Sequence, residues 1–356
     1  MPFLEIENLR VVVDDFTLRE VSFCLNEGEV LALLGPSGAG KTTLIEALSG
    51  LTPLTSGRIL IKGRDITHLP VHKRRIGIVF QDLALFPHLN VYENISFGLK
   101  NRKLSRTVIS EKVNTLLALL GLSGFEKRDV SSLSGGEKQR VALARTLAPE
   151  PDIILFDEPL SAVDEELRSR LREQLSAIQQ RLGFTALYVT HDRDEAFYFA
   201  DMIGVIFDGR IWQIDKPQNV YEQPVTPKVA EFLGIENRLR AEVIVDQAEG
   251  YMVRFADEKL YLTLQEKLQP GDLLDILIKP EKALLTEEAL SANTFPVTIK
   301  NSKNYGSKTE YIVELAGQKL KVLLRDTRIL FQPDDHLHLT LNPKDLLVYK
   351  NNVLIN

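Results

Sequence analysis

One short stretch constrains this chain more than any other, because it fits the phosphate-loop pattern G-x-x-x-x-G-K-[ST]. Its members are Gly35, Pro36, Ser37, Gly38, Ala39, Gly40, Lys41, Thr42 and Thr43. Residues 30–34 before it are typical of a buried strand, and the apolar spacing of residues 44–48 predicts a helix that ends at Gly50. Glycines let the backbone wrap a phosphate without Cβ clashes, and the amides of a helix N-terminus face the negative charge. A glycine-rich turn is the alternative, but the flanking elements favour a nucleoside triphosphate site.

Two polar side chains in this stretch suit the chemistry of a triphosphate, and a second pair follows downstream. Lys41 is placed to reach the β- and γ-phosphates, and the Thr42 hydroxyl is placed to hold Mg²⁺. After Asp152, residues 153–156 are a continuous apolar run, typical of a buried parallel strand. We expect Asp157 after it to hold Mg²⁺ through water, and Glu158 to orient or deprotonate the attacking water. An exposed acidic turn is the alternative interpretation of this pair.

Two further strands are predicted to end in polar side chains. Residues 74–80 lead to Gln81, and residues 185–190 lead to His191. Because ligands collect at the carboxyl ends of strands in an open α/β sheet, Gln81 is expected to contact Mg²⁺ or the attacking water. A lone histidine is more often structural than catalytic. His191, however, follows a phosphate loop and a strand with two carboxylates, which favours contact with the γ-phosphate.

A second helix tip suited to anions is predicted near the middle of the chain. Ser134 is a natural N-cap with Glu137 three residues later, which is the spacing of a capping box. Gly135 and Gly136 leave the first amides of this helix bare. A capping box alone is common and is weak evidence for a site. Because the chain also has a phosphate loop, we infer that this second helix tip and the phosphate loop belong to one shared ligand site.

Several other side chains each have two interpretations. Phe16, next to a pair of aspartates, either stacks on an adenine ring or faces inward from a strand. The apolar loop tip Leu85–His88 either docks a partner or tucks into the core, and we favour docking. The single cysteine, Cys24, excludes an internal disulfide and a cysteine-based zinc site, and we expect it to be a small core residue.

The bulk properties limit the class of protein. The 356 residues are enough for two or three domains. The sequence has no apolar run near the ~20 residues of a membrane-spanning helix, and its N-terminus does not look like a signal peptide. We therefore expect a cytoplasmic protein whose membrane role, if it has one, runs through a partner. The net charge of −6 argues against broad nucleic-acid binding.

The two ends of the chain differ from its middle in their periodicity. Residues 3–34 alternate between short β-rich runs and polar turns, which predicts antiparallel strands beside the phosphate-loop strand. From about residue 238 onward the same alternation predicts a small β-barrel or sandwich. His336 and His338 share one strand face there, and a solvated face is favoured over a metal site.

Taken together, residues 3–234 resemble the ATP-binding subunits of ABC transporters. The specific element is the signature LSGGEKQR at Leu133–Arg140, which generic phosphate-loop ATPases lack. The resemblance implies an α/β P-loop NTPase at residues 1–234, with a RecA-like core, an antiparallel β subdomain and a helical subdomain at about residues 83–148.

Residues 235–356 resemble the transport-associated OB-like (TOBE) domain of importer ATPases. The turn Ile278–Lys282 and a barrel repeat at Phe295–Arg325 carry this second resemblance. It implies an all-β regulatory domain, which either binds a ligand or protein or lengthens a dimer interface.

The resemblance also assigns roles to the candidate residues. In this family two copies sandwich two ATP molecules, so the phosphate loop of one copy faces Ser134, Gly135 and Gly136 of the other, and we group Glu137 with them. The other matching residues are Gln81 (Q-loop), Asp157 (Walker B aspartate), Glu158 (catalytic glutamate), Asp164 (D-loop aspartate at the dimer seam) and His191 (switch histidine).

The same resemblance implies partners and location. We expect a homodimer that binds ATP and Mg²⁺ and powers import through a separate permease, which docks near Gln81 and Leu85–His88. An extracytoplasmic binding protein would act indirectly, and the subunit would sit on the inner face of the membrane without binding nucleic acid.

The cargo is less readable than the chemistry. The join at residues 232–237 looks more like importers of inorganic ions (molybdate, tungstate, sulfate or ferric iron) than like sugar importers, and polyamines stay open. A soluble ABC ATPase acting on ribosomes or DNA is the main rival, although the tandem cassettes or coiled-coil arm of that class are not seen here. A second rival is a protein that acts chiefly as a regulator through its C-terminal domain.

Overall fold

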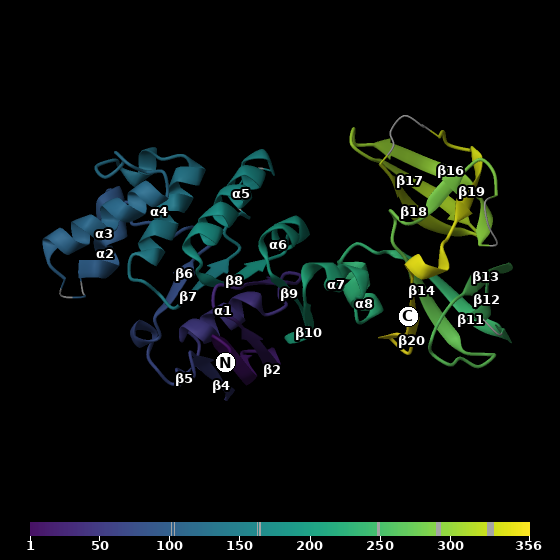
Figure 1. The fold of residues 1–356 in the computed structure, drawn as a ribbon, viewed down its shortest axis with the longest axis horizontal. Coiled ribbons are helices and arrows are strands. Elements are labelled where there is room, and N and C mark those ends of the chain that lie inside the picture. The colour runs from purple at the N-terminus through teal and green to yellow at the C-terminus, as the bar shows by residue number, and fades with distance from the viewer. Residues whose placement is uncertain are drawn as a thin grey trace. The chain divides into compact units, whose positions relative to one another are not determined.

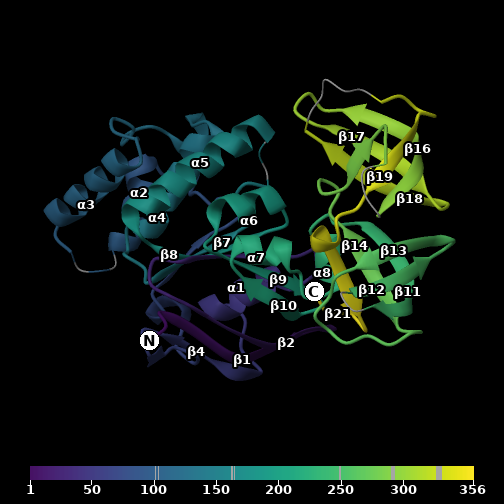
Figure 2. The same cartoon turned by 45° about the vertical axis from the view of Figure 1, so that its right-hand side comes forward.

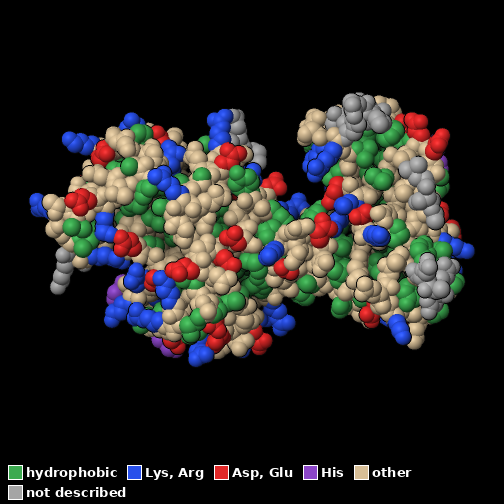
Figure 3. Space-filling model, viewed as in Figure 1, with side chains coloured by type: hydrophobic (Ala, Val, Ile, Leu, Met, Phe, Trp, Pro, Cys, Tyr) green, Lys and Arg blue, Asp and Glu red, His purple; other side chains and the backbone are tan. Residues whose placement is uncertain are grey.

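The computed structural model describes residues 1–100, 102, 104–161, 163, 165–247, 250–289, 293–325 and 331–356. These residues form two compact units, Met1–Pro217 and Gln218–Asn356, and each unit has its own hydrophobic core (Figure 1). The expected domain limit at residue 234 marks the end of the family resemblance and stays a prediction. On the face shown in Figure 3, basic and acidic side chains are interspersed over both units.

A six-stranded sheet in the order β10-β9-β3-β8-β7-β6 is the centre of the first unit. Its strands are β3 (Val30–Leu34), β6 (Ile76–Val79), β7 (Ile153–Asp157), β8 (Thr185–Thr190), β9 (Met202–Phe207) and β10 (Arg210–Asp215). All pairs are parallel except β9–β10. Every residue of β3 and of β8 is buried, as expected for strands covered on both faces. The parallel order brings the ends of β3, β7 and β8 to one edge, which confirms the three predicted buried strands.

A second sheet, antiparallel and in the order β2-β1-β4-β5, accounts for the alternation near the N-terminus. It contains β1 (Leu4–Val13), β2 (Phe16–Leu25), β4 (Ser56–Ile61) and β5 (Arg64–Asp65). The tight turn between β1 and β2 places Asp14 at a positive φ of 48°. The expectation for Cys24 is wrong: it is exposed, because Phe23 and Leu25 occupy the buried face of β2 and alternation turns Cys24 outward.

Six helices complete the first unit within the described residues. They are α1 (Lys41–Ser49), α2 (Val91–Lys100), α3 (Arg106–Leu119), α4 (Gly135–Leu147), α5 (Glu165–Leu182) and α6 (Arg193–Phe199). Helix α1 ends at Gly50 in the left-handed conformation, as the sequence predicts. Helices α2, α3 and α4 lie together in both views (Figures 1 and 2) and share one apolar cluster that includes Ile95, Val113 and Leu143. No helix among the described residues is long and apolar enough to cross a membrane.

The second unit contains two antiparallel sheets, in the orders β13-β12-β11-β14-β20-β21 and β15-β19-β16-β17-β18. Short helices α7 (Pro217–Glu222) and α8 (Pro227–Phe232) precede β11 (Asn237–Gln247), β12 (Gly250–Phe255), β13 (Glu258–Leu262), β14 (Leu273–Ile278), β15 (Leu284–Thr286), β16 (Thr294–Asn304), β17 (Thr309–Leu315), β18 (Gln318–Leu324), β19 (His336–Thr340), β20 (Leu346–Lys350) and β21 (Val353–Leu354). Alternate residues of these strands build one apolar core, which confirms the predicted all-β domain.

Candidate active site

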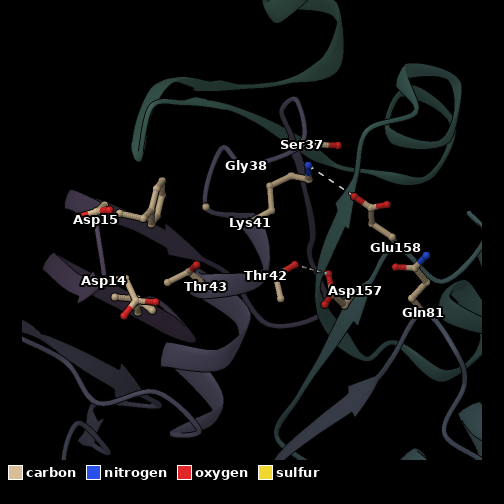
Figure 4. Close-up of a pocket in the computed structure, with 13 residues that line it drawn as sticks. Asp14, Asp15, Ser37, Gly38, Lys41, Thr42, Thr43, Gln81, Asp157 and Glu158 are labelled. Carbon is tan, nitrogen blue, oxygen red and sulfur yellow. Dashed lines mark hydrogen bonds and ion pairs between the residues drawn. The ribbon is translucent and has the colours of Figure 1, made fainter.

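A cleft of about 660 Å³ lies where the phosphate loop, the β1–β2 turn and the ends of β6 and β7 converge (Figure 4). It is lined by Val13, Asp14, Asp15, Phe16, Ser37, Gly38, Gly40, Lys41, Thr42, Thr43, Gln81, Asp157 and Glu158. The structure therefore brings together most of the predicted site residues from segments far apart in the sequence. The phosphate-loop residues Gly35, Pro36 and Ala39 are not among the lining residues.

The backbone of the phosphate loop leaves no room for side chains at two of its glycines. A Cβ on Gly35 would lie 2.4 Å from the carbonyl oxygen of Ile206. Gly40 has a φ of 102°, and a Cβ there would lie 2.5 Å from Cζ of Phe16. The Gly35 clash is with a backbone atom and cannot relax cheaply, and L-residues avoid the conformation of Gly40, so both positions require glycine. The amides at the start of α1 are left without a side-chain cap, as an anion site needs.

The Lys41 side chain is buried, with 5% of its surface exposed, and it points along the loop toward β7. Its Nζ donates to the carbonyl oxygens of Gly35 at 2.8 Å and of Pro36 at 3.0 Å. Nζ also lies 3.5 Å from Oε1 of Glu158 (Figure 4). The ammonium group is therefore held in the loop by two carbonyls and faces one carboxylate.

A set of oxygen atoms suited to a hard cation lies beside the lysine. The Thr42 hydroxyl donates to Oδ1 of Asp157 at 3.3 Å, and Gln81 lines the same cleft. Burial raises the pKa of Asp157, and the nearby charge of Glu158 adds to that rise. Hydroxyl, carboxylate and amide oxygens are the ligands that Mg²⁺ prefers, and a cation would favour the ionised form of Asp157. The residues present therefore fit Mg²⁺.

Glu158 contacts both Lys41 and His191 through its carboxylate. Its φ of 45° is unusual for a residue with a side chain, and its amide donates to the carbonyl oxygen of Val189 at 3.0 Å. Its Oε2 lies 3.0 Å from Nδ1 of His191, while its Oε1 faces Lys41. A strained backbone at such a junction is typical of a functional site. His191 does not line the cleft but reaches it through Glu158.

The signature segment is built as predicted but lies outside the lining of this cleft. Ser134 caps α4: its hydroxyl accepts from the amide of Glu137 at 3.4 Å, and the Glu137 carboxylate accepts from the amide of Ser134 at 2.7 Å. The hydrogen bond from Ser134 lowers the pKa of Glu137. Gly136 packs against α5, where a Cβ would lie 2.9 Å from Cδ2 of Leu171. The cleft of one copy is thus formed without Ser134, Gly135, Gly136 or Glu137.

Comparison with known proteins decides the family. A sequence model described as ABC transporter matches residues 18–161, and one described as TOBE domain matches residues 276–348. The spermidine/putrescine import ATP-binding protein PotA of Thermotoga maritima is 39% identical over 357 residues, which span 97% of each chain. This chain belongs to the ATP-binding subunits of ABC importers.

Two further relatives agree with this assignment. The spermidine/putrescine import ATP-binding protein PotA of Acidothermus cellulolyticus is 40% identical to this ABC subunit over 303 residues, covering 84% of this chain and 79% of the relative. The solved structure of CbiO1 from Clostridium perfringens, described as part of the ABC transporter complex CbiONQ, has 31% identity and a TM-score of 0.57. It covers 66% of this chain and 99% of its own. The predicted fold class, ATP binding and ATPase activity coupled to import are confirmed.

The β1–β2 turn of the ABC subunit contributes the candidate residue Phe16 to the cleft, together with three residues that sequence reasoning did not assign. Phe16 is half-buried and packs its ring edge against Gly40, so it lies in the cleft beside the phosphate loop. Val13, Asp14 and Asp15 complete that wall. Their only sequence signal is their position next to Phe16, since a two-residue acidic turn between strands is common.

The remaining predicted positions have mixed outcomes. Asp164 lies outside the described residues. Leu85 and Phe86 are half-buried, and the Phe86 ring centroid lies 4.5 Å from that of Phe97, so this loop tip of the ABC subunit is less exposed than expected. Arg145 ties the loop to α4 by donating to the carbonyl oxygens of residues 83 and 84.

The histidines of β19 have local partners. His336 contacts the Thr298 hydroxyl at 3.2 Å, and His338 contacts the carbonyl oxygen of Glu287 at 3.1 Å. Within the described parts of the chain, no cluster of three or more His, Cys, Asp or Glu side chains could hold a metal ion.

Proposed function

We propose that this ABC subunit hydrolyses ATP with Mg²⁺ as a homodimer and thereby powers the import of polyamines through a separate permease. The observation that carries the catalytic part is the convergence of Lys41, Thr42, Asp157 and Glu158 in one cleft, with His191 in contact with Glu158. The cargo rests on the names of two relatives that match most of the chain.

The phosphate loop is proposed to hold the triphosphate. The uncapped amides of α1 would donate to the β- and γ-phosphates, and Lys41 would exchange its contact with Glu158 for phosphate oxygens. Thr42, Asp157 and Gln81 would hold Mg²⁺, which when bound neutralises charge on the phosphate oxygens. Phe16, beside Gly40, is proposed to contact the adenine ring.

Glu158 is proposed to be the general base. It would accept a proton from water as the water oxygen bonds to the γ-phosphorus, and the bond to the bridging oxygen breaks to leave ADP and phosphate. The loss of the Lys41 contact on nucleotide binding would free Oε1 for that water. His191 would keep Oε2 oriented through its 3.0 Å contact and would reach the γ-phosphate with its other ring nitrogen.

The exposed tip of α4 is proposed to complete the site of a second copy. Ser134, Gly135 and Gly136 present a hydroxyl and free amides, which suit the phosphates of an ATP bound to the other copy. Glu137 supports this tip through the capping box. Asp164 is proposed, by family resemblance alone, to lie at the seam between the two copies.

The permease is proposed to dock near Gln81 and the Leu85–His88 loop, on the inner face of the membrane. Gln81 is exposed, and Phe97 beside the loop keeps 45% of its surface exposed. An exposed aromatic side chain next to an apolar loop is a suitable docking surface for a helix of the permease.

The predicted inorganic-ion cargo has no support from the relatives, and the polyamine alternative fits them better. Both named PotA relatives are spermidine/putrescine import proteins. The join at residues 232–237, on which the ion prediction depended, is short and is a weak guide to cargo.

The test is reconstitution of the full chain in lipid vesicles with the permease and binding protein encoded beside it. Phosphate release should rise when the binding protein carries spermidine or putrescine, and should not rise with molybdate or sulfate. The matched control is the same complex with Glu158→Gln, which should assemble but not respond. Stimulation by an oxyanion, or hydrolysis that ignores the permease, would contradict the proposal.

A further inference from the structure

Beneath the histidine of the site lies a buried carboxylate that the proposed mechanism does not use. Glu195, on α6, has only 2% of its surface exposed. A carboxylate in such a place is costly unless hydrogen bonds or an opposite charge compensate it. Its position four residues after His191 raises the question of which groups hold it there.

Two hydroxyl groups from β8 donate to the same oxygen of Glu195. The Tyr188 hydroxyl lies 3.0 Å and the Thr190 hydroxyl 2.8 Å from Oε2. Both side chains lie on one face of the strand, and both residues are nearly fully buried. The guanidinium of Arg168 adds a weaker contact, with Nε 4.0 Å from Oε1. Burial raises the pKa of Glu195, which the two hydroxyl donors oppose.

The Thr190 hydroxyl has a second task in the turn that carries His191. Its oxygen accepts a hydrogen bond from the amide of Asp192 at 3.0 Å. A hydroxyl has one proton and two lone pairs, so a proton committed to Glu195 leaves a lone pair aimed at that amide. His191 lies between the two bonded residues, and the turn is closed around it.

Pairing with the neighbouring strands β3 and β7, and hydrogen bonds from Arg168, fix the position of this turn. Thr190 pairs with Leu34, the last residue before the phosphate loop, and Val189 pairs with Asp157. Asp192 caps α6 and accepts from Arg168 at 3.2 Å, while Arg168 also donates to the carbonyl oxygen of Val163. A small shift of the turn would therefore change the 3.0 Å contact between His191 and Glu158.

We propose that Glu195 is a positioning residue: its carboxylate orients the Thr190 hydroxyl, and the hydroxyl fixes the turn that presents His191 to Glu158. This inference rests on the proposed role of His191 in hydrolysis. Tyr188 provides a matched control for Thr190. Among the described contacts, its hydroxyl donates to the same oxygen of Glu195 but does not accept from the amide of Asp192.

The experiment measures kcat and KM for ATP with the full-length chain and its variants. Thr190→Val should lower kcat about tenfold with KM within twofold, and Thr190→Ser should restore it, since the hydroxyl returns. Tyr188→Phe should keep kcat within twofold while lowering the unfolding midpoint as much as Thr190→Val. Glu195→Gln should keep most of the activity, because its amide oxygen can accept both hydroxyl donors.

A double-mutant cycle separates positioning from general stability. In a His191→Ala background, followed by sensitive phosphate detection, Thr190→Val should change kcat less than twofold. A wild-type kcat for Thr190→Val, an equal loss for Tyr188→Phe, or a further tenfold loss in the His191→Ala background would overturn the inference. If His191→Ala itself keeps full turnover, the proposed role of His191 fails and this inference fails with it. If His191→Ala loses turnover and Thr190→Val does not, the inference alone fails.

Discussion

The N-termini of α1 and α4 are both built to face an anion, but they differ in what one copy of the chain supplies. The tip of α1 has no side-chain cap, and it lines a cleft with a buried lysine and two carboxylates. The tip of α4 is exposed, is capped by Ser134, and lies outside the lining of that cleft. In the function we propose, the first tip belongs to a site that one copy nearly completes, while the second is half of a site that needs another copy.

The largest expected effect tests the cleft itself. Glu158→Gln removes the proposed base without changing the size of the side chain, so kcat should fall about 10³-fold. ATP affinity should stay within a few-fold, because Lys41 and the loop amides are unchanged. Steady-state phosphate release together with nucleotide titration measures both quantities. Near-normal turnover would remove Glu158 from the account.

The next effect concerns the backbone of the α1 tip. Gly35→Ala should cost about 2–4 kcal/mol of stability and abolish ATP binding, because its Cβ would meet the carbonyl oxygen of Ile206 at 2.4 Å. Gly38→Ala is the matched control, since its φ of 79° is strained for alanine but the space around it is open. It should cost only about 1 kcal/mol. Equal unfolding midpoints for the two variants would show that the Gly35 clash relaxes.

The α4 tip can be tested against a second serine cap in the same unit. Ser134 and Ser105 are both exposed N-caps, which accept from the third amide of their helices at 3.4 and 3.3 Å. Each change to alanine should cost about 1 kcal/mol of stability. Only Ser134→Ala should also lower ATP turnover, by about tenfold, because only that hydroxyl is proposed to reach the partner's nucleotide. Equal turnover in both variants would reduce Ser134 to a helix cap.

The smallest effect is a pH dependence of stability. Burial raises the pKa of Asp157, so without a cation the wild type loses stability as pH rises through that raised pKa. Asp157→Asn does not titrate and should therefore unfold about 2 °C higher than wild type near pH 8. The difference should vanish below about pH 3, where the carboxyl is protonated in both folded and unfolded states. Thermal scans without nucleotide or Mg²⁺ measure it, and a pH-independent difference would contradict this explanation.

Much of the cleft could be predicted because its signals are local in sequence. The phosphate loop lies between an apolar run and a helix, and the carboxylates Asp157 and Glu158 directly follow a buried strand. The parallel order of a sheet then brings these strand ends together. The capping box of Ser134 and Glu137 is equally local, and the structure contains it.

The rest depends on contacts between distant segments, which a single sequence does not reveal. The sequence pattern predicts Arg74 only as the start of a strand, yet it is buried and donates to the carbonyl oxygens of Ala47 and Leu48 at the end of α1. The packing of Phe16 on Gly40 and the burial of Glu195 likewise follow from the fold rather than from spacing. Charged side chains are usually exposed, so periodicity places them on the surface by default.

The proposed function depends on one ATP being held by the α1 tip of one copy and the α4 tip of another. The most direct test is sedimentation of Glu158→Gln with ATP, beside the double variants Glu158→Gln/Ser134→Arg and Glu158→Gln/Ser105→Arg. We expect a trapped dimer for Glu158→Gln and for the Ser105 double variant, and a monomer with bound ATP for the Ser134 double variant. A stable dimer in spite of Ser134→Arg, or an ATP-bound monomer for Glu158→Gln alone, would contradict this expectation.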